Sequence, residues 1–449
     1  MIMSDQHTPS ASGCYGNKIS KTPNLDAMAR SGLLFDNAYC NNPVCVPSRM
    51  SMLTGLYSHE IDVWHNADAL PSQFATWPLV LQTGGYETVI SGRNHLLWGS
   101  RMAGFSHRLC GDESTFIPHI KKGRTQIGAY GPQGIDGHIG ASEESVYAKH
   151  DEEANRMAVD YLENATGENP FALFIGYYQP HAPFVAAPEY FSLYENWTPE
   201  CDLDEVLADI YHPLLKTLQL DREIPREKLL TAIKAYYAMV AHVDDMTGGI
   251  MKTLENTGLS DKTIVIYTSD HGEMLGRHRL WHKMCFYEDS ARIPMIIKAP
   301  RQFAQGEKIK ENVSLLDIFP SFVDWAGVEC DLSLAGNSLR DCVENGDPMP
   351  DRPVITESIG VERGHPGRMV KYGNFKLIKY YQRPPLLFDL ENDPDERRDL
   401  AGEDEFSEIL GKMLEMLNED WNPDAVNKVI DRNLRHLRYH NLVSLRNRN

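Results

Sequence analysis

Residues 263–272 read TIVIYTSDHG, and this stretch gives the clearest indication of the fold class. Its first six residues are β-branched or aromatic, a composition typical of a buried strand. Ser269, Asp270 and His271 follow at once, and carboxylate and imidazole groups are common ligands of metal ions. The stretch therefore predicts a buried strand with a functional group at its carboxyl end.

Two other apolar runs end in the same way. Residues 1–7 read MIMSDQH and place Asp5 after a short strand, and residues 171–181 read FALFIGYYQPH and place His181 after a longer one. In open parallel sheets, ligands bind beyond the carboxyl ends of the strands, so we expect Asp5 and Asp270 to meet in space. A single such aspartate is more simply explained as turn chemistry, but three matching strand ends favour a functional site.

Strand-like runs alternate with amphipathic helical segments along most of the chain. This alternation predicts an α/β fold with a large, mostly parallel sheet flanked by helices. Thr22 and Pro23 are expected to start the first helix as its N-cap and first helical residue. The segments expected are helices at 22–32 and 225–258, the second broken or loosened at 248–249, further strands at 86–90 and 295–298, and a glycine-rich surface loop at 123–142.

The character of the sequence changes after about residue 345. Residues 369–381 (MVKYGNFKLIKYY) alternate apolar and polar side chains around a Tyr-Gly-Asn turn, which predicts an antiparallel hairpin. A charged helical tail follows. We therefore expect a catalytic α/β domain over residues 1–345 and a smaller C-terminal α+β domain with antiparallel strands over residues 346–449.

The composition limits the partners that the chain can have. Its 449 residues carry a net charge of −19, and so acidic a surface repels nucleic acid at long range. An anionic substrate would therefore need a local cluster of cations. No apolar stretch is long enough to cross a bilayer. The eight cysteines form no CxxC pair, which indicates mostly free thiols rather than a zinc ribbon.

No signal peptide is visible at the start of the chain. The chain as given is therefore expected in the cytoplasm, or in the periplasm or outside the cell if a further segment precedes residue 1. The sequence makes no prediction of the oligomeric state.

A second polar cluster lies at Cys45-Val46-Pro47-Ser48-Arg49. These residues open a helical run over 48–54 that Gly55 closes. A helix amino terminus presents free N–H groups and the positive end of the helix dipole, so it favours an anion. The planar guanidinium of Arg49 also suits an oxyanion. On these grounds alone, Cys45 is equally a buried structural thiol or a nucleophile with a lowered pKa.

These clusters resemble, in order, the motifs of the type I sulfatases of the alkaline phosphatase superfamily. Residues 45–49, with the downstream Met52-Leu53-Thr54-Gly55, resemble the signature of that family, C-x-P-S-R followed by T-G. The likeness runs from about Asp5 to Leu400. The other matching motifs are Asp5-Gln6, Gly85-Tyr86-Glu87-Thr88, Gly92-Arg93-Asn94-His95, Pro180-His181-Ala182-Pro183, Ser269-Asp270-His271-Gly272-Glu273, Leu280-Trp281-His282-Lys283 with Tyr287-Glu288, and Leu387-Phe388-Asp389-Leu390 with Asp393-Pro394 and Glu396.

The resemblance implies an alkaline phosphatase-like fold and the hydrolysis of sulfate esters. In this family the signature cysteine, here Cys45, is oxidised to formylglycine by a formylglycine-generating enzyme. One hydroxyl of the hydrated aldehyde attacks sulfur and expels the alcohol, and the other later expels sulfate. The likeness also implies one divalent metal held by Asp5, Gln6, Cys45, Asp270 and His271. Ca²⁺ is the first candidate because it prefers oxygen ligands, and Mn²⁺ or Zn²⁺ are the alternatives because an imidazole suits them better.

The remaining matches imply roles around the sulfate. Arg49 and Lys283 match residues that hold the formylglycine and the sulfate, and His95 matches a candidate base for the release step. His181 matches a substrate-side histidine that, with Lys283, is a candidate acid for the leaving oxygen. Arg93 stands where many members carry lysine, so its role in binding substrate is electrostatic. The simpler alternatives are that His95 is a loop histidine with satisfied hydrogen bonds and that Lys283 is a solvated charge.

Two other functions stay open from the sequence. Gln6 with His271 also occurs in phosphonate monoester and phosphodiester hydrolases that use formylglycine, so such an enzyme is the alternative. A non-catalytic binding protein would apply if Cys45 stayed a thiol. The substrate is expected to be a sulfate ester of a small molecule or a carbohydrate. The loops over 101–145 and 184–222 are expected to select its alcohol.

Overall fold

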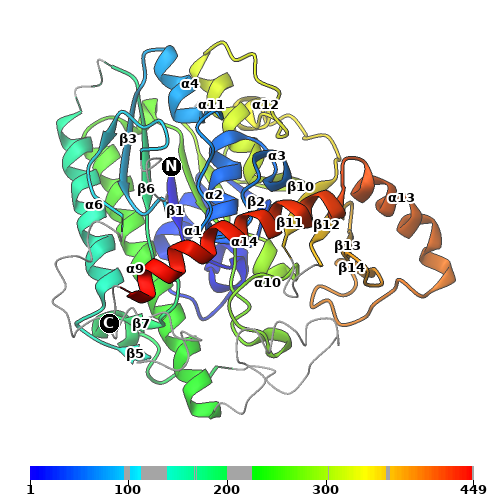
Figure 1. The fold of residues 1–449 in the computed structure, drawn as a ribbon. Helices are drawn as coiled ribbons and strands as arrows, with labels where there is room; N and C mark the ends of the chain where they lie inside the picture. Colours follow the sequence, from blue (N-terminus) through cyan, green and yellow to red (C-terminus); the bar gives the residue numbers. More distant parts are fainter. Residues whose placement is uncertain are drawn as a thin grey trace.

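An eight-stranded sheet lies at the centre of the protein (Figure 1). The computed structural model describes residues 1–95, 102–112, 139–165, 167, 169–199, 225–301, 303–359 and 365–446. The strands run parallel except β9, which is antiparallel to both of its neighbours. In spatial order the strands are β10 Glu307–Ser314, β2 Leu33–Tyr39, β9 Met295–Lys298, β8 Val265–Ser269, β1 Ile2–Ser4, β6 Phe171–Gly176, β3 Glu87–Gly92 and β4 His107–Arg108.

The register of the central strands places their polar ends side by side. Ser4 at the end of β1 lies opposite Ser269 at the end of β8, and β1 pairs in parallel with β6 on its other side. The residues that follow these strands therefore leave the sheet at one edge. The mostly parallel α/β fold is confirmed, and Asp5 and Asp270 emerge from adjacent strands as predicted.

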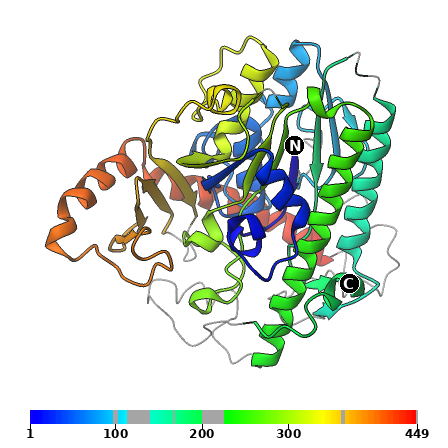
Figure 2. The same cartoon turned by 180° about the vertical axis from the view of Figure 1, so that it is seen from behind.

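Helices cover both faces of the sheet. Successive residues of a strand point to opposite sides, so each strand contacts both helical layers. The helices are α1 Pro23–Arg30, α2 Cys45–Thr54, α3 Ser58–Ile61, α4 Trp77–Thr83, α6 Val146–Asn164, α7 Pro188–Ser192, α9 Arg226–Asn256, α10 Glu288–Ala291, α11 Ile318–Ala326 and α12 Arg340–Asn345. Ile2 and Tyr267 pack with α1, α6 and α9 on one face. Met3 and Ile266 pack with α2, α4 and α11 on the other. Figure 2 shows α9 running along the first face beside α6.

Helix α9 is continuous at Gly248 and Gly249, where the sequence predicted a broken or loosened helix, so the predicted break was wrong. A Cβ atom on Gly248 would lie 2.4 Å from side-chain atoms of Asn24. The glycine therefore permits close packing of α1 on α9 rather than a bend. Asp244 of α9 also accepts hydrogen bonds from the backbone N–H groups at the start of α1. It provides the cap that the side chain of the predicted N-cap residue, Thr22, does not provide.

A four-stranded antiparallel sheet lies beside the larger one (Figure 1). Its strands are β11 Val354–Ser358, β12 Gly367–Tyr372, β13 Phe375–Tyr380 and β14 Leu386–Asp389. The hairpin expected at 369–381 is confirmed as β12 and β13. Helix α13 Ser407–Asn418 packs on this sheet, and α14 Pro423–Arg446 crosses in front of α2 in Figure 1. The division into two domains at residue 345 stays a prediction.

Other predictions concern loops, thiols and membranes. The loop expected at 123–142 lies outside the described residues up to 138, and β5 Gly140–Ala141 then pairs in parallel with β7 Val185–Ala186. The seven cysteines within the described ranges are free thiols. No helix in the described part of the chain is long and apolar enough to cross a membrane.

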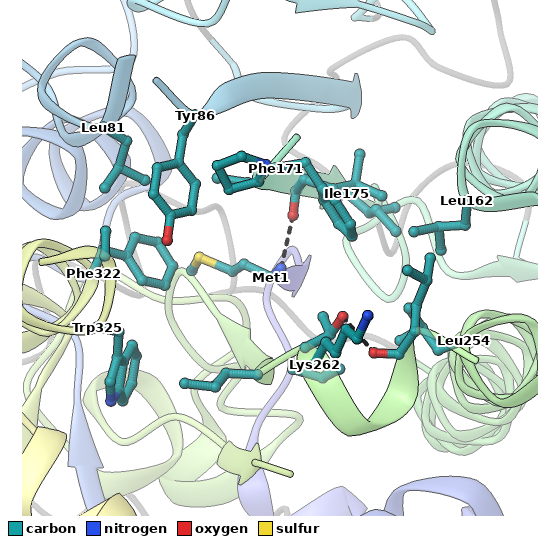
Figure 3. Close-up of a pocket in the computed structure, with 18 of the residues that line it drawn as sticks. Met1, Leu81, Tyr86, Leu162, Phe171, Ile175, Leu254, Lys262, Phe322 and Trp325 are labelled. Atoms are coloured by element: carbon teal, nitrogen blue, oxygen red, sulfur yellow. Dashed lines mark hydrogen bonds between the residues drawn. The ribbon is translucent and has the colours of Figure 1, made fainter. Parts of the chain in front are cut away.

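A cavity of about 460 Å³ opens at the amino ends of the central strands (Figure 3). It is mostly apolar, and Trp77, Phe171, Leu254 and Trp325 contribute to its wall. The amino group of Met1 also borders it and donates to the carbonyl oxygen of Leu173 at 2.8 Å. The polar residues follow the carboxyl ends of the same strands. This cavity therefore lies at the opposite end of the strands and is separate from the candidate site.

Buried charge joins the smaller sheet to α3. Arg368 of β12 is fully buried, and its Nε donates to the carboxylate of Glu357 in β11 at 2.8 Å. His59 of α3 lies 2.8 Å from the same carboxylate. Loss of the guanidinium would leave Glu357 buried with the imidazole as its remaining ion-pair partner among the described residues.

We therefore expect Arg368→Ala to lower the free energy of unfolding by about 3 kcal/mol, because breaking a buried ion pair strands a charge. Denaturant unfolding measures this loss. Arg398→Ala is the control, since Arg398 and Glu403 form an exposed pair, and such a pair contributes less than about 1 kcal/mol. Equal losses of unfolding free energy in the two variants would contradict a stabilising role of the buried pair between Arg368 and Glu357.

Candidate active site

Cys45 is the first residue of α2. Val44 before it has extended backbone angles (φ −141°, ψ 133°), and Pro47 lies in the first turn, where a missing N–H donor costs no helical hydrogen bond. Gly55 ends the helix in the left-handed conformation, with φ 69°. The helix begins three residues earlier than the predicted 48–54. Cys45 therefore lies directly at the helix amino terminus.

Arg49, one turn along α2 from Cys45, holds two buried carboxylates. Its Nη2 lies 3.2 Å from Oδ2 of Asp5, and its Nε lies 2.8 Å from Oδ2 of Asp270. The other oxygen of each carboxylate, Oδ1, faces His271, whose Nε2 lies 3.9 Å from Oδ1 of Asp5 and 3.6 Å from Oδ1 of Asp270. The guanidinium thus orients both carboxylates toward one point.

Asp5, Cys45, Asp270 and His271 each offer one atom to this point, and the four atoms lie within 4.8 Å of one another. Nε2 of His271 lies 3.2 Å from Sγ of Cys45. Two carboxylate oxygens, an imidazole nitrogen and a thiol sulfur are a donor set that fits a divalent metal ion.

Nearby cations set the ionisation of this cluster. Burial raises the pKa of the Cys45 thiol, but Lys283, His271 and the hydrogen bond with His181 together outweigh burial and lower that pKa well below its usual value. Burial also opposes ionisation of Asp5, yet Arg93 and other cations lower the pKa of that carboxyl far below its usual range. An acidic protein therefore carries, at this one place, the local cluster of cations that an anionic substrate needs.

Lys283 links His181 to Gln6. Its Nζ lies 2.9 Å from Nε2 of His181 and donates to the amide oxygen of Gln6. Nδ1 of His181 donates to the carbonyl oxygen of Ala182 at 2.5 Å, so Nε2 is the acceptor that faces the ammonium group. Burial and Lys283 lower the pKa of His181, which keeps its imidazole neutral. Lys283 is therefore the donor in its hydrogen bond with His181.

The side chain of Gln6 is held at both ends. Its Nε2 donates to Oε2 of the buried Glu273, and its Oε1 accepts from Lys283. Its backbone N–H donates to Oδ1 of Asp270 at 3.1 Å, and its φ of 70° lies in the left-handed region. Gln6 thus borders the cluster, and its predicted role as a metal ligand stays a prediction.

Arg93 joins His95 to the cluster. Arg93 is fully buried, its Nε donates to Oδ2 of Asp5 at 2.5 Å, and its guanidinium lies 4.0 Å from the ring centroid of Tyr178. Its Nη2 lies 2.8 Å from Nδ1 of His95, whose backbone N–H donates to Asp112 at 2.5 Å. Both predicted residues therefore lie close to the site, and their roles toward a substrate stay predictions.

Sequence reasoning missed Asn66. Its Oδ1 accepts the backbone N–H of Val46 at 3.0 Å, and its Nδ2 lies 3.8 Å from Sγ of Cys45. The surrounding sequence, DVWHNAD over 62–68, shows no motif, so only the fold brings this amide to the thiol. Glu273 and Asp112, which fix Gln6 and His95, were likewise given no role.

Comparison with known proteins gives matches along nearly the whole chain. Residues 1–328 match the family described as Sulfatase, and residues 276–422 match N-sulphoglucosamine sulphohydrolase, C-terminal. The choline-sulfatase of Rhizobium meliloti (strain 1021) is 31% identical over 399 residues, covering 84% of this chain and 77% of that protein. The N-acetylglucosamine-6-O-sulfatase of Bacteroides thetaiotaomicron is 27% identical, covering 93% and 85%. The crystal structure of the phosphonate monoester hydrolase of Agrobacterium radiobacter superposes with a TM-score of 0.78 at 24% identity, covering 93% and 94%.

The structural match to the phosphonate hydrolase, at that identity, shows a shared fold. The sequence matches go further. The Sulfatase match covers well over half of the chain, and the choline-sulfatase aligns with most of it. This chain belongs to the sulfatase family, the sulfuric ester hydrolases of the alkaline phosphatase superfamily.

Proposed function

We propose that the protein hydrolyses sulfate esters with a formylglycine made from Cys45 and with one divalent metal ion. Asp5, Asp270 and His271 would hold the metal, residue 45 would complete the site, and Gln6 would be a weaker ligand. A formylglycine-generating enzyme is the partner that makes the modification. The observation that supports this most is the convergence of two buried carboxylates, an imidazole and Cys45 within 4.8 Å.

The charge of the site suits a singly negative sulfate ester. Arg49, Arg93 and Lys283 place three cations around the two carboxylates of the cluster, and a bound divalent ion would bring the positive charge into excess. Such an excess in a buried site draws an anion and stabilises the negative charge that develops in the transition state. The metal, when bound, acts as a Lewis acid on the sulfate and lowers the pKa of the attacking hydroxyl.

Side chains of the site carry out the other steps of the reaction. Arg49 orients residue 45 and both carboxylates. Lys283 holds a proton against Nε2 of His181, and this pair delivers it to the departing alcohol oxygen. His95, held by Asp112, would serve as the base of the release step through Nδ1, once that atom gives up the hydrogen bond that it accepts from Arg93.

Calcium is the first candidate for the metal. The two carboxylates and the amide oxygen of Gln6 are the hard oxygen ligands that calcium prefers. Mn²⁺ and Zn²⁺ are the alternatives, because the imidazole of His271 suits them better.

The alcohol that carries the sulfate is a small molecule or a carbohydrate. Two relatives are named for choline sulfate and for the 6-O-sulfate of N-acetylglucosamine. We propose esters of these two kinds as the first substrates to test. The loops expected to select among them, 101–145 and 184–222, lie in large part outside the described residues.

A phosphonate monoester or phosphodiester hydrolase is the second candidate, because the phosphonate monoester hydrolase shares this fold. Charge does not separate the two, since a phosphonate monoester and a sulfate monoester each carry one negative charge. The room available for a second substituent on phosphorus is what we expect to distinguish the two substrates. The second substituent of a phosphonate or diester needs room that His181 and Lys283, in contact at 2.9 Å, reduce.

We therefore expect kcat/KM for an aryl sulfate to exceed that for an aryl phosphonate with a leaving group of the same pKa. Contacts of this kind discriminate by about 1–3 kcal/mol, so weak diesterase activity is expected as well. Steady-state kinetics of the modified enzyme on both esters measures the preference. If the phosphonate is preferred by more than about tenfold, about 1.4 kcal/mol in barrier, the second candidate replaces the first.

A further inference from the structure

Helix α14 lies beyond both family regions, the second of which ends at residue 422. It packs on segment 62–68, the loop that carries Asn66. Val426 and Ile430 of α14 are buried in one cluster with Trp64 of that segment. The helix is therefore docked on the loop beside Cys45 rather than left as a free tail.

Polar contacts fix the loop to the same helix. Nδ2 of Asn433 donates to the carbonyl oxygen of Asp62 at 3.3 Å and to Oδ1 of Asp68 at 3.4 Å. Nη2 of Arg432 lies 3.1 Å from Oδ2 of Asp62. One turn of α14 thus bonds both ends of segment 62–68.

Asp68 closes the turn that presents Asn66. Its Oδ2 accepts the backbone N–H groups of Trp64 at 2.8 Å and His65 at 2.9 Å, while its Oδ1 faces Asn433. The side chain of Asn66 is exposed, so core packing does not set its position. The turn sets it, and the amide reaches Val46 N–H and the thiol of Cys45.

We infer that α14 is a positioning element of the active site. Through Asn433 and Asp68 it holds the turn that presents the Asn66 amide to residue 45. The amide then offers an N–H donor beside the nucleophile, where an oxygen of formylglycine or of the bound anion accepts it. The inference rests on the proposed function, because it takes residue 45 as the nucleophile.

A double-mutant cycle on kcat/KM tests the coupling, with Asn433→Ala, Asn66→Ala and the double variant. Each single change is expected to lower kcat/KM by about five- to tenfold, the effect of one lost hydrogen bond. The kcat/KM of the double variant should be no more than about twofold below that of Asn66→Ala, because both changes remove the same contact, that of the Asn66 amide with residue 45. Asn433→Asp, which loses the donor and sets a carboxylate against Asp68, should lose more than Asn433→Ala.

Arg435→Ala is the matched control on the same helix. Its Nε donates to the carbonyl oxygen of Asp431 within α14 at 3.2 Å, so this hydrogen bond stays inside the helix and does not reach segment 62–68. Its kcat/KM should stay at the parent value. If the losses from Asn433→Ala and Asn66→Ala multiply, or if Arg435→Ala loses as much as Asn433→Ala, the inference is wrong.

Hydrogen exchange separates this inference from the proposed function. The backbone amides of Trp64 and His65 should exchange at least about threefold faster in Asn433→Ala, because the turn loses its support. This readout does not depend on catalysis. Unchanged exchange overturns the role of α14, whereas an enzyme inactive on every sulfate ester overturns the proposed function alone.

Discussion

Asp270→Ala is expected to abolish both metal binding and turnover. The substitution removes the inward Oδ1 atom, 3.6 Å from Nε2 of His271, and leaves Arg49 with Asp5 as its remaining carboxylate partner. A divalent ion would then face one carboxylate, which cannot neutralise it. We expect bound metal to fall from one ion per chain to near zero and kcat to fall by at least about 10³-fold.

Elemental analysis of purified protein, with kcat measured on the same sample, checks this expectation. Asp270→Asn keeps an oxygen acceptor for the backbone N–H groups of Gln6 and His271, so it separates lost charge from lost shape, and it should also lose the metal. Asp261→Ala is the control, because Asp261 is exposed and its ion-pair partner, Arg301, is exposed as well. Reloading stripped enzyme with Ca²⁺, Mn²⁺ or Zn²⁺ then ranks the three ions. Full activity in chelator-treated, metal-free enzyme would show that the ligands are misassigned.

Cys45→Ala is expected to lower kcat by about 10⁴-fold or more while leaving the metal in place. Without the side chain there is no precursor of formylglycine, and loss of a covalent nucleophile is among the largest effects of a single substitution. Asp5, Asp270 and His271 still converge, so one ion per chain should remain. Cys45→Ala should therefore lose activity but keep the metal, whereas a variant of a metal ligand such as Asp270→Ala should lose both.

Cys40→Ala provides the comparison for that loss. Cys40 is also a buried thiol, but burial raises its pKa, so it lacks the lowered pKa that a nucleophilic thiol needs. Its removal should leave kcat within about twofold of the parent. A comparable loss in both variants would point to a general effect of removing buried thiols instead of a role specific to Cys45.

The central sheet and one half of the site followed from local sequence patterns. The strands at 171–178 and 263–268 are dense in apolar and β-branched residues, and such runs form strands wherever they are buried. Polar residues directly after parallel strands must share one sheet edge, so Asp5 and Asp270 could be paired across the chain without knowledge of the fold. The structure brings both to Cys45 and Arg49.

Other features depend on contacts that no local pattern carries. The glycines at 248–249 suggested a weak helix, but Gly248 makes room for Asn24, and this close approach arises only when α1 packs on α9. Asn66 lies in a segment without a motif and reaches Cys45 because Asp68 and α14 shape its turn. The ion pair of Arg93 with Asp5 likewise joins two segments that only the fold brings together.

Mass spectrometry of the peptide that contains residue 45, paired with the specific activity of the same preparation on a sulfate ester, tests the central claim most directly. Protein made with the formylglycine-generating enzyme should show the thiol replaced by an aldehyde at Cys45. Across preparations, sulfatase activity should rise in proportion to the modified fraction. A preparation that hydrolyses sulfate esters at full rate with only the unmodified cysteine at this position would contradict the account.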